Sequence, residues 1–235
     1  MIFAPPLEEG VFLRRYRRFF ADVRCADGSE ITLHCANTGS MLDCQVPGSR
    51  CWFSRSAAPR RKLPGTLEIV TTRDGRRAGI NTLRANALVA EALAAGWIDT
   101  LRGYPSQRRE VRYGSGNSRI DFLLEARDRP PCHVEVKSVT LSLGDGVAAF
   151  PDAVTQRGVK HLRELETVAE QGGRAVLLYC VQLSDVDAVA PADALDPAYG
   201  AALRRAARRG VAVLAWGCRV AAEEIRLAEP LEVRL

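Results

Sequence analysis

The chain has 235 residues and a formal net charge of +5 at pH 7. This length is sufficient to bury the core of one large or two small domains. No apolar run approaches the ~20 residues that a membrane span needs, and no basic segment followed by an apolar core opens the chain as in a signal peptide. These absences exclude an integral membrane protein and predict a soluble, cytoplasmic one. The chain has seven cysteines, an odd number, and none of them form a Cys-x-x-Cys pair. We therefore expect reduced, buried thiols.

The 33 basic residues are concentrated in short arginine runs. Such runs predict a polyanionic partner, although an arginine-rich composition can also reflect a GC-rich genome. The runs are Arg14–Arg15 with Arg17–Arg18, Arg60–Lys62, Arg108–Arg109, and Arg204–Arg205 with Arg208–Arg209.

The first part of the chain, residues 1–82, consists of short strand-like segments separated by glycine and proline turns. The strands are expected at 17–25, 30–35, 50–54, 67–71 and 78–80. Regularly spaced short strands predict a small β-barrel of the OB type. In such a barrel Arg15, Arg17 and Arg18, which lie beside Tyr16 and the Phe19–Phe20 pair, would bind single-stranded nucleic acid. The alternative is that the two phenylalanines are core residues and the arginines a solvated face.

The hydrophobic period changes near residue 82, where we place the start of a second domain, 83–235. Helices are expected at 83–95, 153–170 and 197–209, and strands at 108–113, 119–125, 132–139, 174–181 and 211–216. The last two strands are apolar on both faces, as in a sheet covered by helices. The pattern predicts a mixed α/β domain, and because no flexible linker separates the two parts, we expect them to pack together.

The strands at 119–125 and 132–139 are predicted to form a hairpin. Ile120, Phe122 and Leu124 are expected on one face and Asp121 on the other. Centring the turn near Asp128 gives opposed residues a constant sum of ~256, which places Asp121 opposite Glu135.

The same register places Arg119 opposite Lys137. Two carboxylates at this spacing suit Mg²⁺ or Mn²⁺, and Lys137 would sit beside a bound phosphate. Asp121, Glu135 and Lys137 are therefore the candidate catalytic residues. The alternative is that Glu-x-Lys is an exposed strand pattern without a catalytic role.

The helix at 153–170 has polar residues at spacings of three and four, so that they share one face. They are Gln156, Arg157, Lys160, His161 and Glu164. Packed beside the hairpin, Arg157 and Lys160 would bind nucleic acid, with Gln156 or Lys160 reaching the same phosphate and His161 assisting. An ordinary solvated helix face is the alternative.

The order helix, three strands, helix, strand, with Asp121 on one hairpin strand and Glu135-x-Lys137 on the next, resembles the core of the PD-(D/E)XK nuclease superfamily. The whole chain resembles the sugar fermentation stimulation protein A family. The segments that carry this second resemblance are residues 3–7, 15–19, 33–39, 81–83, 110–114, 118–122, 134–140, 150–155, 157–158 and 160–162.

The resemblance implies an OB-like N-terminal barrel, a nuclease-like C-terminal domain, DNA binding without sequence preference and a role in the regulation of maltose metabolism. It also makes Glu110 a candidate third metal ligand beside Asp121 and Glu135. Arg119 joins Arg157 and Lys160 as a candidate for contact with nucleic acid.

Three functions remain open at this point. The first is a DNA-binding protein with a Mg²⁺- or Mn²⁺-dependent phosphodiesterase site. The second is a DNA-binding module in which that site does not turn over. The third is a metal-dependent enzyme that acts on a small phosphorylated metabolite.

Overall fold

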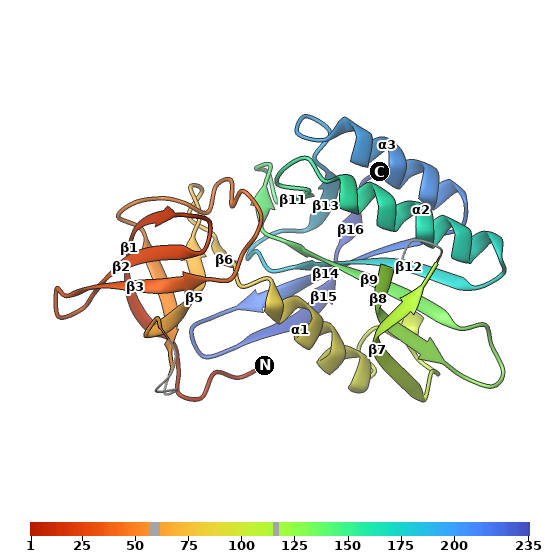
Figure 1. The fold of residues 1–235 in the computed structure, drawn as a ribbon, viewed down its shortest axis with the longest axis horizontal. Helices are drawn as coiled ribbons and strands as arrows, with labels where there is room; N and C mark the ends of the chain where they lie inside the picture. Colours follow the sequence, from red (N-terminus) through yellow and green to blue (C-terminus); the bar gives the residue numbers. More distant parts are fainter. Residues whose placement is uncertain (57–61, 115–117) are drawn as a thin grey trace.

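The computed structural model describes residues 1–56, 62–114 and 118–235, so Arg60 and Arg61 of the second arginine run lie outside it. Within the described residues, β1 to β5 form a closed N-terminal barrel in which β3 and β5 pair in parallel and close the ring. A short strand, β6, extends β5. The expected OB-like barrel is confirmed (Figure 1). The bounds are β1 Glu8–Tyr16, β2 Phe20–Cys25, β3 Glu30–Cys35, β4 Arg50–Arg55, β5 Gly65–Thr71 and β6 Arg77–Gly79.

The strand expected at 17–25 was placed wrongly at its start. Strand β1 ends at Tyr16, Arg17 to Phe19 form a turn, and β2 begins at Phe20. A bulge between Phe12 and Arg14 interrupts the alternation of apolar and polar residues in β1. This strand was therefore not predicted from the two-residue period of the sequence.

The C-terminal domain is built on a sheet with the strand order β15-β14-β12-β9-β8-β7. Strands β9, β12 and β14 are parallel, while β7, β8 and β15 pair antiparallel with their neighbours. The expected helices and strands occur in the expected order and the mixed α/β class is confirmed, but the edge strand β15, after the expected last strand, was not predicted. The strands are β7 Ser106–Tyr113, β8 Ser118–Glu125, β9 Cys132–Val139, β12 Arg174–Val181, β14 Ala212–Val220 and β15 Ile225–Pro230.

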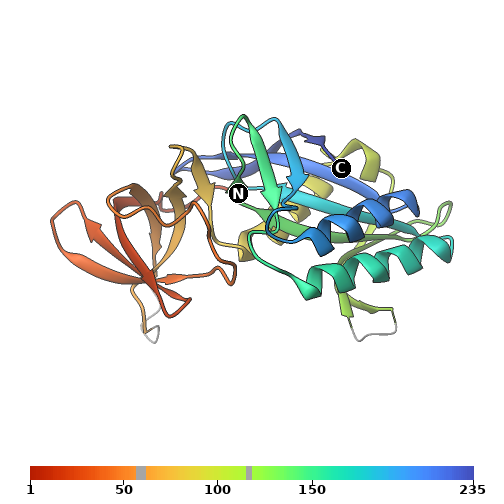
Figure 2. The ribbon, with the colours of Figure 1, turned by 90° about the horizontal axis from the view of Figure 1, so that it is seen from above.

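Helices cover both faces of this sheet. Helix α1 (Leu83–Ala94) packs on one face, and α2 (Gln156–Glu170) and α3 (Pro197–Arg208) lie side by side on the other (Figure 2). Strand β12 shows the division by its alternation. Val176, Leu178 and Cys180 pack in the cluster of α1, while Leu177 and Tyr179 pack in the cluster of α2 and α3. Burial on both faces explains why this strand is apolar throughout.

A small sheet of β10, β11, β13 and β16 lies beside the main sheet. Its strand β11 leads directly into the segment that precedes α2, and so helps to position the start of that helix. The remaining bounds are β10 Leu141–Ser142, β11 Val147–Phe150, β13 Ala188–Pro191, β16 Glu232–Val233 and a short 3-10 helix at Asp99–Leu101.

The two parts of the chain share a core and a polar junction. Phe53 and Leu67 of the barrel belong to the same buried cluster as Leu177 of the C-terminal sheet. At the junction the carboxylate of Glu68, 1% exposed, accepts hydrogen bonds from Arg84 Nη2 and Asn81 Nδ2, both at 2.8 Å. The barrel is therefore packed against the second domain, as the lack of a linker suggested.

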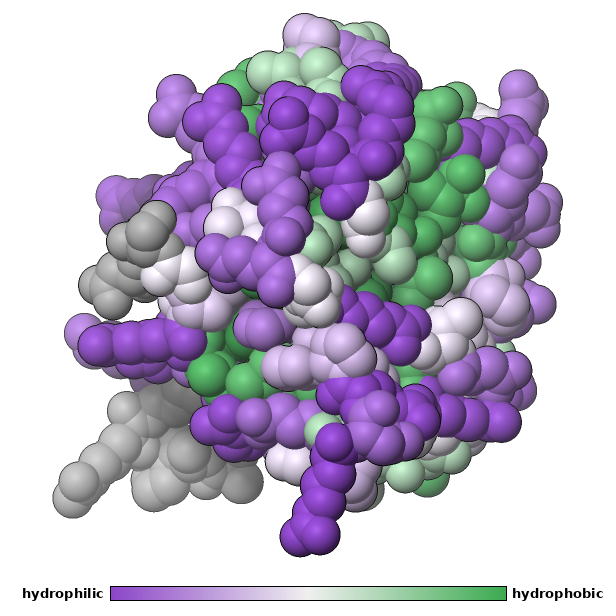
Figure 3. Space-filling model, turned by 90° about the vertical axis from the view of Figure 1, so that its right-hand side faces the viewer, coloured by the Kyte–Doolittle hydropathy of each residue, from purple (hydrophilic) through white to green (hydrophobic). Residues whose placement is uncertain are grey.

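All seven cysteines lie in the described residues and are free thiols; six are buried, as expected, and Cys25 is half-buried. No helix in the described ranges is long and apolar enough to cross a membrane. The end of the C-terminal domain away from the barrel is covered mainly by hydrophilic side chains, with some apolar ones exposed between them (Figure 3).

Candidate functional site

Strands β8 and β9 separate at the predicted carboxylates. The backbone pairs Phe122 with Val134, Leu123 with His133 and Leu124 with Cys132, so the predicted register is confirmed. The backbone pairing of β8 with β9 stops at Phe122, so the adjacent residue, Asp121, is not paired with β9 through its backbone. At this position the Asp121 side chain links the two strands instead, because its Oδ2 accepts a hydrogen bond of 2.7 Å from Val136 N.

The predicted alternation of β8 is wrong at one position. Phe122 and Leu124 pack in the cluster of α1 as expected, but Ile120 packs in the cluster of α2 on the other face. The change occurs at Asp121, opposite Glu110 on β7, where Glu110 has a left-handed φ of 54°. The neighbouring pairs on both sides remain in the ladder. This local irregularity frees Asp121 from regular pairing.

Glu135 is the centre of a buried polar cluster. Val134 and Val136 pack toward α1, so Glu135 points to the opposite face and meets α2. Its Oε1 accepts a hydrogen bond of 2.7 Å from Lys137 Nζ and is also bonded to His161 Nδ1. Arg157 Nε donates to His161 Nε2 at 3.3 Å. Because Nε2 accepts, Nδ1 carries the ring proton and donates to Glu135.

The other oxygen of this carboxylate, Glu135 Oε2, is buried and has no hydrogen-bond partner among the described residues. The Glu135 side chain is only 4% exposed. Burial, the largest single influence, raises the pKa of Glu135, but the hydrogen bond from His161 and the charge of Lys137 outweigh it, so the net pKa lies below its ordinary value. Buried charged oxygens are normally hydrogen-bonded or coordinate a cation, so Glu135 Oε2 is a candidate cation ligand.

Asp121 lies beside this cluster in a different electrostatic state. Burial, followed by the negative charge of Glu135, raises the pKa of Asp121 above its ordinary value. Hydrogen bonds from Val136 N and from Asn86 Nδ2, which is 2.7 Å from Asp121 Oδ1, oppose this shift. When two carboxylates lie close together, the charge of one raises the pKa of the other, and such pairs are common at cation sites.

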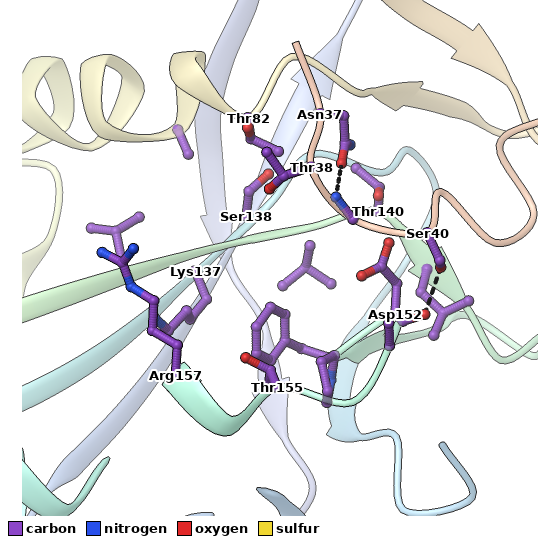
Figure 4. A pocket seen from close by; sticks show the side chains of 18 of the residues that line it. Asn37, Thr38, Ser40, Thr82, Lys137, Ser138, Thr140, Asp152, Thr155 and Arg157 are labelled. Carbon is purple, nitrogen blue, oxygen red and sulfur yellow. Dashed lines mark hydrogen bonds between the residues drawn. The ribbon is translucent and has the colours of Figure 1, made fainter. Parts of the chain in front are cut away.

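These residues open into a cavity of about 850 Å³ between the barrel and the C-terminal domain. Its polar lining comes from both domains and combines charged side chains with six neutral hydroxyl groups (Figure 4). Lys137 and Arg157 lie on the same side of the cavity in this view. The hydroxyl-bearing residues are Thr38, Ser40, Thr82, Ser138, Thr140 and Thr155.

A loop of the barrel forms one wall of the cavity and is bonded to the segment before α2. Ser40 Oγ donates to the carbonyl of Asp152 at 2.6 Å, and Met41 N donates to Asp152 Oδ2 at 2.9 Å. Gly39 is needed for this approach, since a Cβ atom there would lie 2.5 Å from Asp152 Oδ2. Arg15 holds the same loop through the carbonyls of Asn37 and Gly39.

The cavity also lies at the start of α2. Thr155 caps this helix by accepting a hydrogen bond of 3.0 Å from Gly158 N, and Arg157 follows in the first turn. The amino end of a helix attracts anions through its free N–H groups and its dipole. Together with Arg157 and Lys137 it makes this side of the cavity the favourable one for a phosphate.

The structure brings some of the predicted site residues together and leaves others apart. Asp121, Glu135, Lys137, Arg157, His161, Arg15 and Arg18 line the cavity. Arg15 is largely occupied by backbone carbonyls, so it positions the loop.

Five predicted residues are not among those that line the cavity in the described structure: Glu110, Arg17, Arg119, Gln156 and Lys160. Glu110 is exposed on β7, and Lys160 Nζ lies 3.8 Å from Glu164 Oε1. Arg119 pairs with Arg112 on β7, and the pairing of β8 with β9 stops at Phe122, before Arg119 could be paired with Lys137. Within the described ranges, no group of three or more His, Cys, Asp and Glu side chains could hold a metal ion. The candidate cation site therefore rests on two carboxylates, Asp121 and Glu135.

The sequence analysis missed several residues of the cavity. Asn86 supports Asp121 from α1, and Asp152 joins the two domains. Asn37, Thr38 and Asp152 were present in the segments that carried the family resemblance, and that was the available signal. Their place beside Glu135 could not be predicted because they are far from it in the chain.

Comparisons with known proteins match both parts of the chain. The model described as "Sugar fermentation stimulation protein RE domain" matches residues 83–224, and "SfsA N-terminal OB domain" matches residues 13–80. Proteins named sugar fermentation stimulation protein homolog from Pseudomonas putida strain W619 and Pseudomonas paraeruginosa are 59% and 60% identical over 236 residues, covering 100% of this chain and 99% and 100% of theirs.

A solved structure of SfsA from Pyrococcus furiosus, in complex with Ca²⁺, has a TM-score of 0.89 and 28% identity. The match covers 100% of this chain and 98% of that one. This chain therefore belongs to the sugar fermentation stimulation protein family, SfsA, with an N-terminal OB domain.

Proposed function

We propose that this protein binds DNA without sequence preference and cleaves phosphodiester bonds with a divalent cation at Asp121 and Glu135. The observation that carries the proposal is the charged, buried Glu135 Oε2 without a hydrogen-bond partner in the described structure. Mg²⁺ takes one or two carboxylates and leaves other positions to water and phosphate oxygens. The SfsA of Pyrococcus furiosus, whose structure is titled as a complex with Ca²⁺, supports a hard cation in this family.

Each residue of the cluster has a distinct task in this proposal. A bound Mg²⁺ or Mn²⁺ would polarise the phosphate and promote ionisation of a water molecule. Lys137 directs one N–H donor to Glu135 and has others for a phosphate oxygen, where it offsets the negative charge of the transition state. His161 fixes the orientation of Glu135, and Arg157 binds a neighbouring phosphate.

The direct test is incubation of the purified protein with single- and double-stranded DNA and RNA in the presence of Mg²⁺ or Mn²⁺. We expect cleavage that requires the cation and falls by about 100-fold or more in Asp121→Asn and Lys137→Ala. Glu125→Gln is a matched control, because this carboxylate lies on the same strand and is paired with Arg108, away from the cavity.

Other outcomes would point to the remaining functions. Binding without cleavage, unchanged in Asp121→Ala, would mean a DNA-binding module and would contradict the catalytic proposal. Tight binding of a nucleotide or sugar phosphate without DNA binding would indicate an enzyme of small metabolites. Through its family name, the chain is also connected with sugar fermentation, and we propose that DNA binding is the route to that effect.

A further inference from the structure

The reactive groups lie deep in the cavity. The side chains of Glu135, His161 and Lys137 are 4%, 7% and 13% exposed. Duplex DNA presents its phosphates on the outside of a stiff rod with a persistence length of about 150 bp. A phosphate on such a rod reaches recessed groups only if the protein wall opens or the strand leaves the duplex.

Hydrogen bonds between the domains hold one wall of the cavity in place. The barrel loop is joined to Asp152 by the bonds from Ser40 and Met41, and Arg15 holds the loop to the barrel. The cavity of about 850 Å³ has the size of pockets that enclose a small organic ligand. It has room for a few nucleotides of one strand.

A turn of the barrel, Arg17 to Phe19, carries basic and aromatic groups and contributes Arg18 to the lining of this cavity. Arg17 and Arg18 have left-handed φ angles of 45° and 65°, which non-glycine residues adopt only at a cost. Arg18 lines the cavity. The next residue, Phe19, is 39% exposed and stacks on His34 with ring centroids 6.3 Å apart.

This turn, Arg17 to Phe19, has the chemistry of a single-strand platform. A base stacks on an exposed aromatic ring without regard to its identity, while arginines follow the backbone phosphates. The predicted nucleic-acid surface of the barrel and the predicted catalytic hairpin therefore meet at one opening, with Arg18 as the link. The neutral hydroxyl groups inside can bond phosphate oxygens or sugars.

We infer that the site takes single-stranded nucleic acid, which passes from the Arg17–Phe19 turn into the cavity toward Glu135. This inference rests on the proposed function, since it specifies the substrate of the same site. Duplexes enter only where their strands are separated, at frayed ends or unpaired stretches.

The test is a binding titration in EDTA, which prevents cation-dependent cleavage. Fluorescence anisotropy compares a labelled single-stranded oligonucleotide with its blunt duplex on the full-length protein. We expect the single strand to bind about 10-fold tighter or more. Phe19→Ala should weaken single-strand binding by about 5-fold to 100-fold, the range for loss of one stacked base, and Arg18→Ala should weaken it as well.

Trp97→Ala is the matched control, because Trp97 is 40% exposed, close to the value for Phe19, but follows α1 in the second domain and is not part of the Arg17–Phe19 turn. Equal or tighter binding of the duplex would overturn the inference, as would equal effects of Phe19→Ala and Trp97→Ala or no binding of either nucleic acid. The cleavage test is independent of this result, since cation-dependent cleavage of duplexes would keep the proposed function and reject only the single-strand preference.

Discussion

Glu135 combines burial with a charge that its neighbours maintain. One oxygen receives donors from Lys137 and His161, and the other is left without a donor from the described residues. The first pair of contacts explains how the carboxylate remains ionised in a buried place. Burying an unpaired acceptor costs free energy, and this cost at the second oxygen supports the proposed cation site.

Replacing Lys137 with methionine should destabilise the protein at neutral pH. Removing one partner from a buried ion pair costs about 3–5 kcal/mol, and since His161 still donates to Glu135, we expect a loss of about 2–4 kcal/mol in the free energy of unfolding. Urea denaturation measures this loss. Lys62→Met, at an exposed position, is the control and should change the stability little.

The pH dependence of this loss has a definite sign. Lys137 and His161 hold the folded-state pKa of Glu135 below its ordinary value. The stability from Glu135 is thus present above the unfolded-state pKa and lost as the pH falls through the folded-state pKa. The difference between the wild type and Lys137→Met should shrink in acid, and a difference that grows would contradict this assignment.

Asp121 should control the acid limit of cation binding. Its raised pKa means that it takes up a proton at a higher pH than the ordinary value of ~3.9, and a protonated carboxyl is a poor ligand. Asn86→Ala removes a donor that lowers this pKa, so loss of Mg²⁺ affinity should begin at a still higher pH. Calorimetric titration with Mg²⁺ across the acid range measures the shift. The same limit in both proteins would show that Asn86 does not act through Asp121.

At the scale of elements, the strands that were predicted correctly have a simple environment. Strand β12 is buried on both faces and was placed at its observed bounds, Arg174–Val181. Strand β1 was missed and β8 was assigned the wrong face at Ile120, because each contains an irregularity that alternation does not encode. The bulge of β1 and the left-handed Glu110 opposite β8 are properties of strand pairs.

The strained turn between β1 and β2 should lower the stability of the protein while it supports single-strand binding. Asn and Gly adopt positive φ angles more readily than arginine, so the double variant Arg17→Asn with Arg18→Gly should raise the free energy of unfolding by about 1–2 kcal/mol. Single-strand binding should weaken at the same time. Urea denaturation and anisotropy measure the two effects.

The matched control replaces the same two arginines with glutamine. This variant removes the charges but keeps side chains that are strained at positive φ, so binding should fall without a gain in stability. If the Asn-Gly variant is no more stable than the wild type, the strain attributed to this turn does not exist.

At the scale of the whole molecule, the tertiary structure shows which basic side chains are paired with carboxylates. Many arginines of the sequence runs are engaged by carboxylates. Arg108 is paired with Glu125, Arg204 with Asp193 at 2.6 Å and Arg209 with Glu170 at 2.8 Å. In the proposed function, the net charge of +5 attracts a polyanion in general, and the basic groups at the cavity determine where it binds.

Single-strand binding should depend on salt in proportion to the few basic groups at the cavity. Each neutralised phosphate contributes a slope of about −0.7 in log K against log salt. Contacts from Arg17, Arg18, Arg157 and Lys137 would give a slope of about −3. Titrations over a range of KCl concentrations measure it, and Arg18→Ala should reduce the magnitude by about 0.7.

Arg204→Ala is the control for the salt dependence, because this arginine is paired with Asp193 on α3 and does not line the cavity. Its slope should equal that of the wild type. A slope near zero in the wild type, or an equal change in both variants, would contradict the location of the contacts.

The sequence by itself determined the order of the three helices and of the central strands of the second domain, the register of the hairpin and the presence of Asp121, Glu135 and Lys137 on it. These features depend on residues close together in the chain, where alternation and turns are directly visible. Only the tertiary structure decided that Asn86, the loop with Ser40 and the segment with Asp152 surround the same cavity. Such contacts join parts of the chain separated by up to 112 residues. No local period encodes them, because they follow from how the barrel packs against the second domain.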